Sequence, residues 1–249
     1  MLNVWVYSLL SVFIVSLISF AGILTLSIKA EKLKKIILYL VSFSAGALFG
    51  DAFIHLLPQI VEELGFSLVI SLYILLGVVV FFILEKVVHW HHYHYPHTKE
   101  QIHSFAITNL VGDAFHNFID GLIIGASYLL SLPVGVATTI AVFVHEIPQE
   151  IGDFGVLLHG GFTKGKALFF NFITALTAVV GALVALLLST QIGNITTFLI
   201  PLAVGGFIYI AGSDLIPELH KEIQIKKSLL QLMAFILGIM VMVALLAFE

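Results

Sequence analysis

Residues 67–88 read SLVISLYILLGVVVFFILEKVV, an apolar run in which the only charged residues are Glu85 and Lys86. A helix of about 20 apolar residues is long enough to cross the roughly 30 Å hydrocarbon core of a bilayer. The rest of the chain has the same character, because 60% of its 249 residues are hydrophobic and only 10% are charged. Soluble domains carry about 25% charged residues. The sequence therefore predicts an all-α polytopic membrane protein surrounded by lipid.

Seven further apolar runs predict eight transmembrane helices in a single domain that covers residues 1–249. The first run lacks a basic segment and a small-residue cleavage site, so we expect a membrane span there and not a signal peptide. The chain has no cysteine, which excludes disulfides and thiolate metal ligands. The predicted spans are Val4–Ile28, Ile36–Val61, Ser67–Val88, Ser104–Leu130, Val134–His159, Leu168–Leu187, Phe198–Ile216 and Leu229–Phe248.

The basic residues predict the orientation of the helices. All eleven are lysines, and each lies in or beside an odd-numbered connection between predicted spans. The positive-inside rule places these connections in the cytoplasm and both termini outside, and we expect the plasma (inner) membrane. The net charge of −4 gives no indication of a nucleic-acid partner.

Two segments of the chain resemble each other: residues 45–60 read AGALFGDAFIHLLPQI, and residues 204–219 read VGGFIYIAGSDLIPEL. The predicted helices that contain them run in opposite directions, which is typical of transporters built from inverted repeats. Chance matches of small and apolar residues remain an alternative. At a constant offset the matching pairs are Gly46 and Gly205, Ala52 and Ala211, Leu56 and Leu215, and Pro58 and Pro217, while His55 stands opposite Asp214.

Most ionisable residues inside the predicted spans belong to two motifs, DAFHNFIDG at residues 113–121 and HEIPQEIGD at residues 145–153. Such residues are costly in a membrane and mark pathways or binding sites. Each motif lies about 12 residues, or about 18 Å, into its helix, so we expect the two to meet near the midplane. Imidazole and carboxylate groups together suit Zn²⁺ and related ions. The motifs therefore predict a site for one or two divalent transition metal ions.

Helical spacing assigns faces to these polar residues. Asp113, His116 and Asp120 share one face of the fourth span. On the fifth span, one face carries His145 and Gln149, and the adjacent face carries Glu146, Glu150 and Asp153. We expect Asp113, Glu150 and Asp153 to act either as ligands or as supports of ligands. Pro148 has no N–H, so we also expect the carbonyl of Val144 to be free to face a metal ion or water.

Polar residues elsewhere predict a transport path. We expect His55 near an outer entrance, Asp214 near an inner exit and Asn171 along the path, although a packed hydrogen bond is the alternative for each. The connection at residues 88–103 is rich in histidine, which indicates loose auxiliary metal binding or a linker. Its predicted metal-binding residues are His89, His91, His92, His94 and His97.

The sequence resembles the ZIP family of divalent metal transporters over essentially its whole length. The resemblance rests on HNFIDG at 116–121, HEIPQEIGDFGVLLHGG at 145–161, GDAFIHLLP at 50–58 and GSDLIPE at 212–218. It implies a 3+2+3 bundle with inverted repeats around the fourth and fifth helices, a binuclear metal site, and transport of Zn²⁺ into the cytoplasm. By motif position it implies that the ligands are His116, Asn117, Asp120, His145, Glu146 and Gln149, with Glu150 as a further candidate.

Gln149 departs from the pattern, because this subfamily often has His there and an amide is a weaker ligand for transition metals. Fe²⁺, Mn²⁺ and Cd²⁺ are therefore alternative substrates. Gln149 also breaks the HExxH pattern that an intramembrane zinc-dependent hydrolase would need, so we expect a transporter and not an enzyme. An exporter or proton-coupled exchanger stays an alternative, and the small residues of the spans allow a homodimer.

Overall fold

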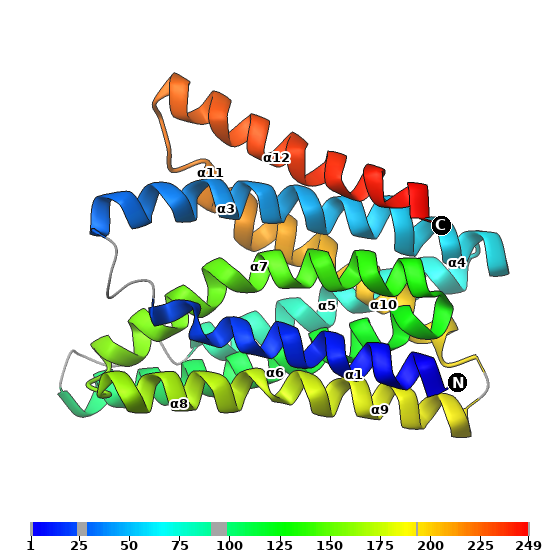
Figure 1. The fold of residues 1–249 in the computed structure, drawn as a ribbon, viewed down its shortest axis with the longest axis horizontal. Coiled ribbons are helices and arrows are strands. Elements are labelled where there is room, and N and C mark those ends of the chain that lie inside the picture. The colour runs from blue at the N-terminus through cyan, green and yellow to red at the C-terminus, as the bar shows by residue number, and fades with distance from the viewer. Residues whose placement is uncertain (1, 24–28, 91–98, 193, 249) are drawn as a thin grey trace.

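The computed structural model describes residues 2–23, 29–90, 99–192 and 194–248, and all regular structure within these ranges is helical. Figure 1 shows the helices lying side by side along the long axis of the molecule. The segments are α1 Leu2–Ser16, η1 Leu17–Ile23, α3 Ala30–Gly50, η2 Asp51–Leu56, α4 Leu57–Leu64, α5 Leu68–Trp90, α6 Lys99–Leu130, α7 Leu132–His159, α8 Lys164–Ala175, α9 Thr177–Gln191, α10 Thr196–Tyr209, η3 Ile210–Leu215, α11 Ile216–Leu219, α12 Ile225–Leu245 and η4 Leu246–Phe248.

The predicted all-α polytopic class is confirmed. Six helical segments in the described part of the chain are long and apolar enough to cross a membrane. Helices α6 and α7, which carry the two polar motifs, are not among them, so their crossing remains a prediction. The six segments are Leu2–Ile23, Glu31–Glu62, Leu68–Lys86, Lys164–Gln191, Thr196–Leu219 and Ile225–Leu245.

The connections that carry lysines gather at one end of the bundle. In Figure 1, α3 and α8 begin at this end, and the turn between α11 and α12 also lies there. The start of α1 and the end of α12 lie at the opposite end. We call the first the lysine-bearing end; by the positive-inside rule it is the predicted cytoplasmic side.

The two similar segments adopt the same unusual structure. The π-helical turns η2 and η3 each begin five residues after a matched glycine, Gly46 or Gly205, and end two residues before a matched proline, Pro58 or Pro217. π-turns are rare and concentrate at functional positions. Their equivalent placement supports the predicted repeat more strongly than sequence identity does.

Helix packing repeats in the same way, with α3 against α12 and α5 against α10. A Cβ added to Gly46 would lie 2.0 Å from the carbonyl oxygen of Phe235, and one added to Gly205 would lie 2.0 Å from that of Ile74. Small residues let membrane helices approach this closely. The partner helices also place a glycine at each crossing. A Cβ added to Gly238 would lie close to the carbonyl oxygen of Phe43, and one added to Gly77 close to that of Leu202.

Helices α6 and α7 occupy the interior of this arrangement. Helix α6 packs on α7, α8, α9 and α10, while α7 also packs on α3 and η1. The histidine-rich connection predicted to bind metal falls outside the described residues at His91, His92, His94 and His97, and the side chain of His89 does too.

Candidate metal site

A single residue, Ser131, connects α6 to α7 and makes the two helices antiparallel neighbours. Its hydroxyl oxygen lies 3.3 Å from the backbone N–H of Val134 and accepts a hydrogen bond from it, which caps the start of α7. Serine is favoured at this position because it satisfies an N–H that has no partner within the helix. The short connection keeps the polar motifs of α6 and α7 at the same level.

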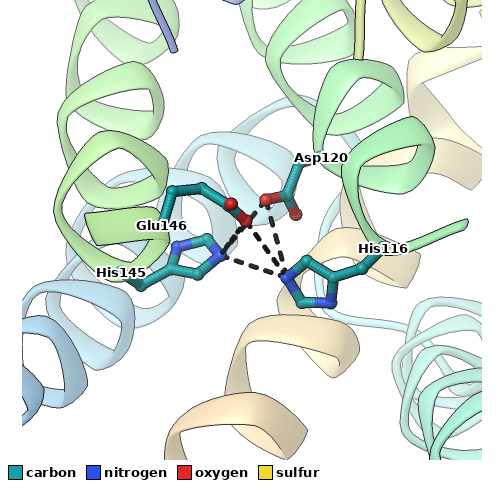
Figure 2. Close-up of side chains that lie close together, drawn as sticks. All are labelled: His116, Asp120, His145 and Glu146. Carbon is teal, nitrogen blue, oxygen red and sulfur yellow. Dashed lines mark hydrogen bonds and ion pairs between the residues drawn. The ribbon is translucent and has the colours of Figure 1, made fainter. Parts of the chain in front are cut away.

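Four side chains from these motifs converge, as Figure 2 shows. His145 Nε2 lies 3.1 Å from Asp120 Oδ2 and 3.4 Å from Glu146 Oε1. His116 Nε2 lies 3.4 Å from Glu146 Oε1 and 3.7 Å from Asp120 Oδ2. The two Nε2 atoms are 3.3 Å apart. We call these four residues the central site.

The spacing of these atoms matches a tetrahedral metal site. Zinc–nitrogen and zinc–oxygen bonds of about 2.0–2.2 Å place tetrahedral ligand atoms about 3.3–3.6 Å from one another. The five distances of the central site run from 3.1 to 3.7 Å. Two imidazole nitrogens and two carboxylate oxygens could therefore hold one Zn²⁺ with little rearrangement.

The surroundings leave the ligand atoms available. His145 Nδ1 lies 3.2 Å from the carbonyl oxygen of Ala141, a contact that places the proton on Nδ1 and leaves Nε2 free for a metal ion. Asp120 and Glu146 are 0% and 1% exposed, and their four carboxylate oxygens have no hydrogen-bond partner within the described part of the chain. Buried carboxylates without such partners are costly unless a cation or proton neutralises them.

The structure brings together four of the seven predicted ligands and places the other three nearby. Asn117 is buried, and its amide donates to Asp113 Oδ1 at 2.8 Å. Gln149 lies with His116 in the wall of a cavity. Glu150 turns away from the central site and accepts a hydrogen bond from Asn171 Nδ2 at 2.5 Å.

The cavity, of about 210 Å³, extends from His116 toward the lysine-bearing end. Its wall includes Asp113, Asp153 and Asp214. Asp214 therefore lines the cavity, and its role at an inner exit stays a prediction. His55 is not among the lining residues: it is 2% exposed, and its Nε2 lies 2.9 Å from the carbonyl oxygen of Met242. His55 therefore makes a packed hydrogen bond, and its place near an outer entrance stays a prediction.

Three polar cavity residues, Glu85, Asn109 and Tyr209, were missing from the sequence prediction. Glu85 lies in an apolar run, where its charge was the available signal, and it accepts a hydrogen bond from the Tyr209 hydroxyl. Asn109 donates to Asp153 Oδ1 at 2.7 Å. A single asparagine near the start of a helix carries no sequence signal that distinguishes it from an ordinary polar residue.

The expectation that the Val144 carbonyl faces metal or water is wrong. Pro148 removes its helical partner as expected, but Ser44 Oγ on α3 lies 3.0 Å from this oxygen and can donate to it. The same hydroxyl lies 2.7 Å from the carbonyl oxygen of Leu40. A side chain from another helix therefore reaches the carbonyl that Pro148 frees, and its single hydroxyl hydrogen is shared between Val144 and Leu40.

Replacing Ser44 with alanine should lower the stability of the protein. The Val144 carbonyl would lose a donor in an apolar surrounding, which costs about 1–3 kcal/mol. Thermal unfolding in detergent measures the effect. Ser71→Ala is the matched control, because its hydroxyl makes an exposed bond to the carbonyl of Ser67, the residue just before its own helix. Equal midpoints for the two variants would contradict this role of Ser44.

Comparisons with known proteins relate the chain to zinc transporters. The family model described as ZIP Zinc transporter matches residues 2–104 and 91–246. The chain is 42% identical over 150 residues to Zinc transporter ZIP13 of Danio rerio, covering 59% of this chain and 43% of that protein. It is 34% identical over 220 residues to Zinc transporter ZIP13 of Pongo abelii, covering 82% and 65%.

A third relative extends over most of both chains. The chain is 30% identical over 307 aligned positions to Zinc transporter zipt-7.1 of Caenorhabditis briggsae, covering 96% of this chain and 78% of that protein. By contrast, it spans less than two thirds of the length of the two ZIP13 proteins.

Proposed function

Because the chain belongs to the ZIP zinc transporter family, we propose that it carries Zn²⁺ across a membrane through the central site. One observation carries the proposal: His116, Asp120, His145 and Glu146 place four unshared ligand atoms at the spacing of a tetrahedral zinc site. Proteins of this family are transporters and not enzymes, so the alternative of an intramembrane hydrolase is not favoured.

The charges of the central site suit a transported divalent ion. Two neutral imidazoles and two carboxylates leave a net charge close to zero when one Zn²⁺ is bound, which limits the cost of holding the ion away from water. Thiolates would hold zinc more tightly, and the chain has none. These nitrogen and oxygen donors therefore bind Zn²⁺ selectively and still allow it to be released.

We propose that the ion leaves through the cavity toward Asp214 and the lysine-bearing end. That end is the predicted cytoplasmic side, and an inside-negative potential favours inward movement by about 2.3 kcal/mol per charge per 100 mV. Rocking of the two repeats against α6 and α7 would alternate the access. The equivalent π-turns η2 and η3 lie where such a motion would bend the helices.

The finer parts of the proposal follow from the residues around the central site. Asn117 and Gln149 flank it and are the candidates for completing a binuclear site. The same nitrogen and oxygen donors would accept Fe²⁺, Mn²⁺ or Cd²⁺. We further propose a plasma (inner) membrane location and a homodimer, which the exposed apolar helices and small-residue contacts allow.

The test is flux of radioactive zinc into proteoliposomes. Wild-type protein should give saturable uptake, and His116→Ala/His145→Ala should reduce it to the level of empty liposomes, because half of the ligand atoms are lost. His159→Ala is the control, since this histidine is exposed at the end of the same helix α7. Uptake that persists in the double variant at equal reconstitution would overturn the central-site assignment.

A further inference from the structure

We propose that Asp113, Glu150 and Asp153 form a second cation site, with oxygen ligands only, which receives the ion from the central site. The role as receiver rests on the proposed transport function. One carboxylate oxygen from each residue lies within 4.8 Å of the others. We call these three residues the carboxylate station.

The position of the carboxylate station follows from the antiparallel helices. Asp113 precedes Asp120 by seven residues on α6, and Asp153 follows Glu146 by seven on α7. At 1.5 Å rise per residue, both displacements are about 10 Å. Because α6 runs away from the lysine-bearing end and α7 runs toward it, both point toward that end. The carboxylate station therefore lies between the central site and the predicted cytoplasm.

Each of the three carboxylates accepts, through one of its oxygens, a hydrogen bond from the neutral side-chain amide of an asparagine. Asn117 donates to Asp113 Oδ1 at 2.8 Å, and Asn109 donates to Asp153 Oδ1 at 2.7 Å. The third pair, Asn171 and Glu150 Oε2, is 2.5 Å apart. Hydrogen bonds of this kind orient ligand carboxylates while leaving the other oxygen for a metal ion. The amides carry no charge, so they do not neutralise the three acids.

The remaining oxygens support a ligand at this position. Asp113 is only 5% exposed, and its Oδ2 has no hydrogen-bond partner in the described part of the chain; the same holds for Asp153 Oδ2. Both residues line the cavity that begins at His116. Three carboxylates this close, two of them on buried residues and the third on a half-buried one, repel one another unless a cation or a proton lies among them. The cavity supplies a route by which a cation reaches them.

The chemistry of the carboxylate station differs from that of the central site. Carboxylate oxygens alone suit hard divalent ions such as Mn²⁺, whereas imidazole favours zinc. Mn²⁺ therefore serves as a probe of the carboxylate station, read by electron paramagnetic resonance on the full-length protein in detergent. Zn²⁺ binding, measured by calorimetry, reports separately on the central site.

Asp153→Asn should weaken Mn²⁺ binding at least about 10-fold, since it removes a charged ligand and keeps the size of the side chain. His145→Ala should leave Mn²⁺ binding within a few-fold of wild type while it weakens Zn²⁺ binding. Glu218→Gln is the matched carboxylate-to-amide control, because this side chain is exposed and pairs with Lys221.

Either of two results would overturn the proposal: wild-type Mn²⁺ affinity in Asp153→Asn, or loss of Mn²⁺ binding in His145→Ala. Retained Zn²⁺ binding shows that Asp153→Asn is folded; if it is not, Glu150→Gln replaces it with the same expected loss. These measurements are of equilibrium binding. They therefore test the carboxylate station even if the protein shows no zinc flux.

Discussion

Replacing His145 with alanine is expected to weaken Zn²⁺ binding to the purified protein by at least about 100-fold. Loss of a partner that only orients a ligand costs 10–100-fold in metal affinity, so loss of the ligand itself should cost at least that much. His145 Nε2 lies within 3.4 Å of three other ligand atoms of the central site, and the imidazole beside it, that of His116, already supplies one of them. Calorimetric titration of the protein in detergent measures the change.

Two controls separate this loss from unfolding. His159→Ala changes an exposed histidine of the same helix and should bind zinc as the wild type does. The thermal midpoint of His145→Ala without zinc shows whether the variant is folded, because it removes the imidazole that lies beside the buried carboxylates of Asp120 and Glu146. An unchanged zinc affinity in a folded His145→Ala protein would show that the ion binds elsewhere.

Alanine at Gly46 or at Gly205 is expected to destabilise the protein strongly and to a similar extent. In each case the new Cβ would lie 2.0 Å from a backbone carbonyl oxygen of the partner helix, Phe235 or Ile74. A backbone atom cannot rotate aside as a side chain does, so the helices must separate. Overpacking costs typically 1–3 kcal/mol and occasionally more, and the loss of close packing adds to it.

Thermal unfolding in detergent, with zinc binding as a second readout, tests this prediction. Gly155→Ala on α7 is the control, because a Cβ there has no heavy atom within 4 Å. It should be neutral or stabilising by up to about 1 kcal/mol, since alanine is the better helix former. If Gly46→Ala unfolds at the same temperature as Gly155→Ala, the close crossing of α3 and α12 does not exist as described.

Apolar runs, the placement of charges and helical spacing predicted much of the fold and of the site. The length of residues 67–88 predicted a membrane helix, because bilayer thickness and helix rise allow few alternatives for such a run. The spacing of His116 and Asp120 put them on one face, because one helical turn brings such residues together. Lysine positions separated the two ends of the bundle. Each of these properties depends on residues that are close to one another in the sequence.

The contacts between helices were decided only by the tertiary structure. Glu146 and Glu150 are spaced to share a face, yet the first joins the central site and the second contacts Asn171. One helical turn separates them by about 6 Å along the axis, which is enough to give them different neighbours. The Val144 carbonyl shows the same dependence, because Ser44 reaches it from another helix.

The sequence by itself thus determined the helices, their polar faces and the histidine and carboxylate motifs, since periodicity and hydropathy are local properties. The tertiary structure decided which four of the seven predicted ligands converge, which asparagines hold the remaining acids, and how closely glycines let the two repeats pack. These features depend on the rotation and separation of helices that are distant in sequence, and side-chain packing over the whole bundle sets both.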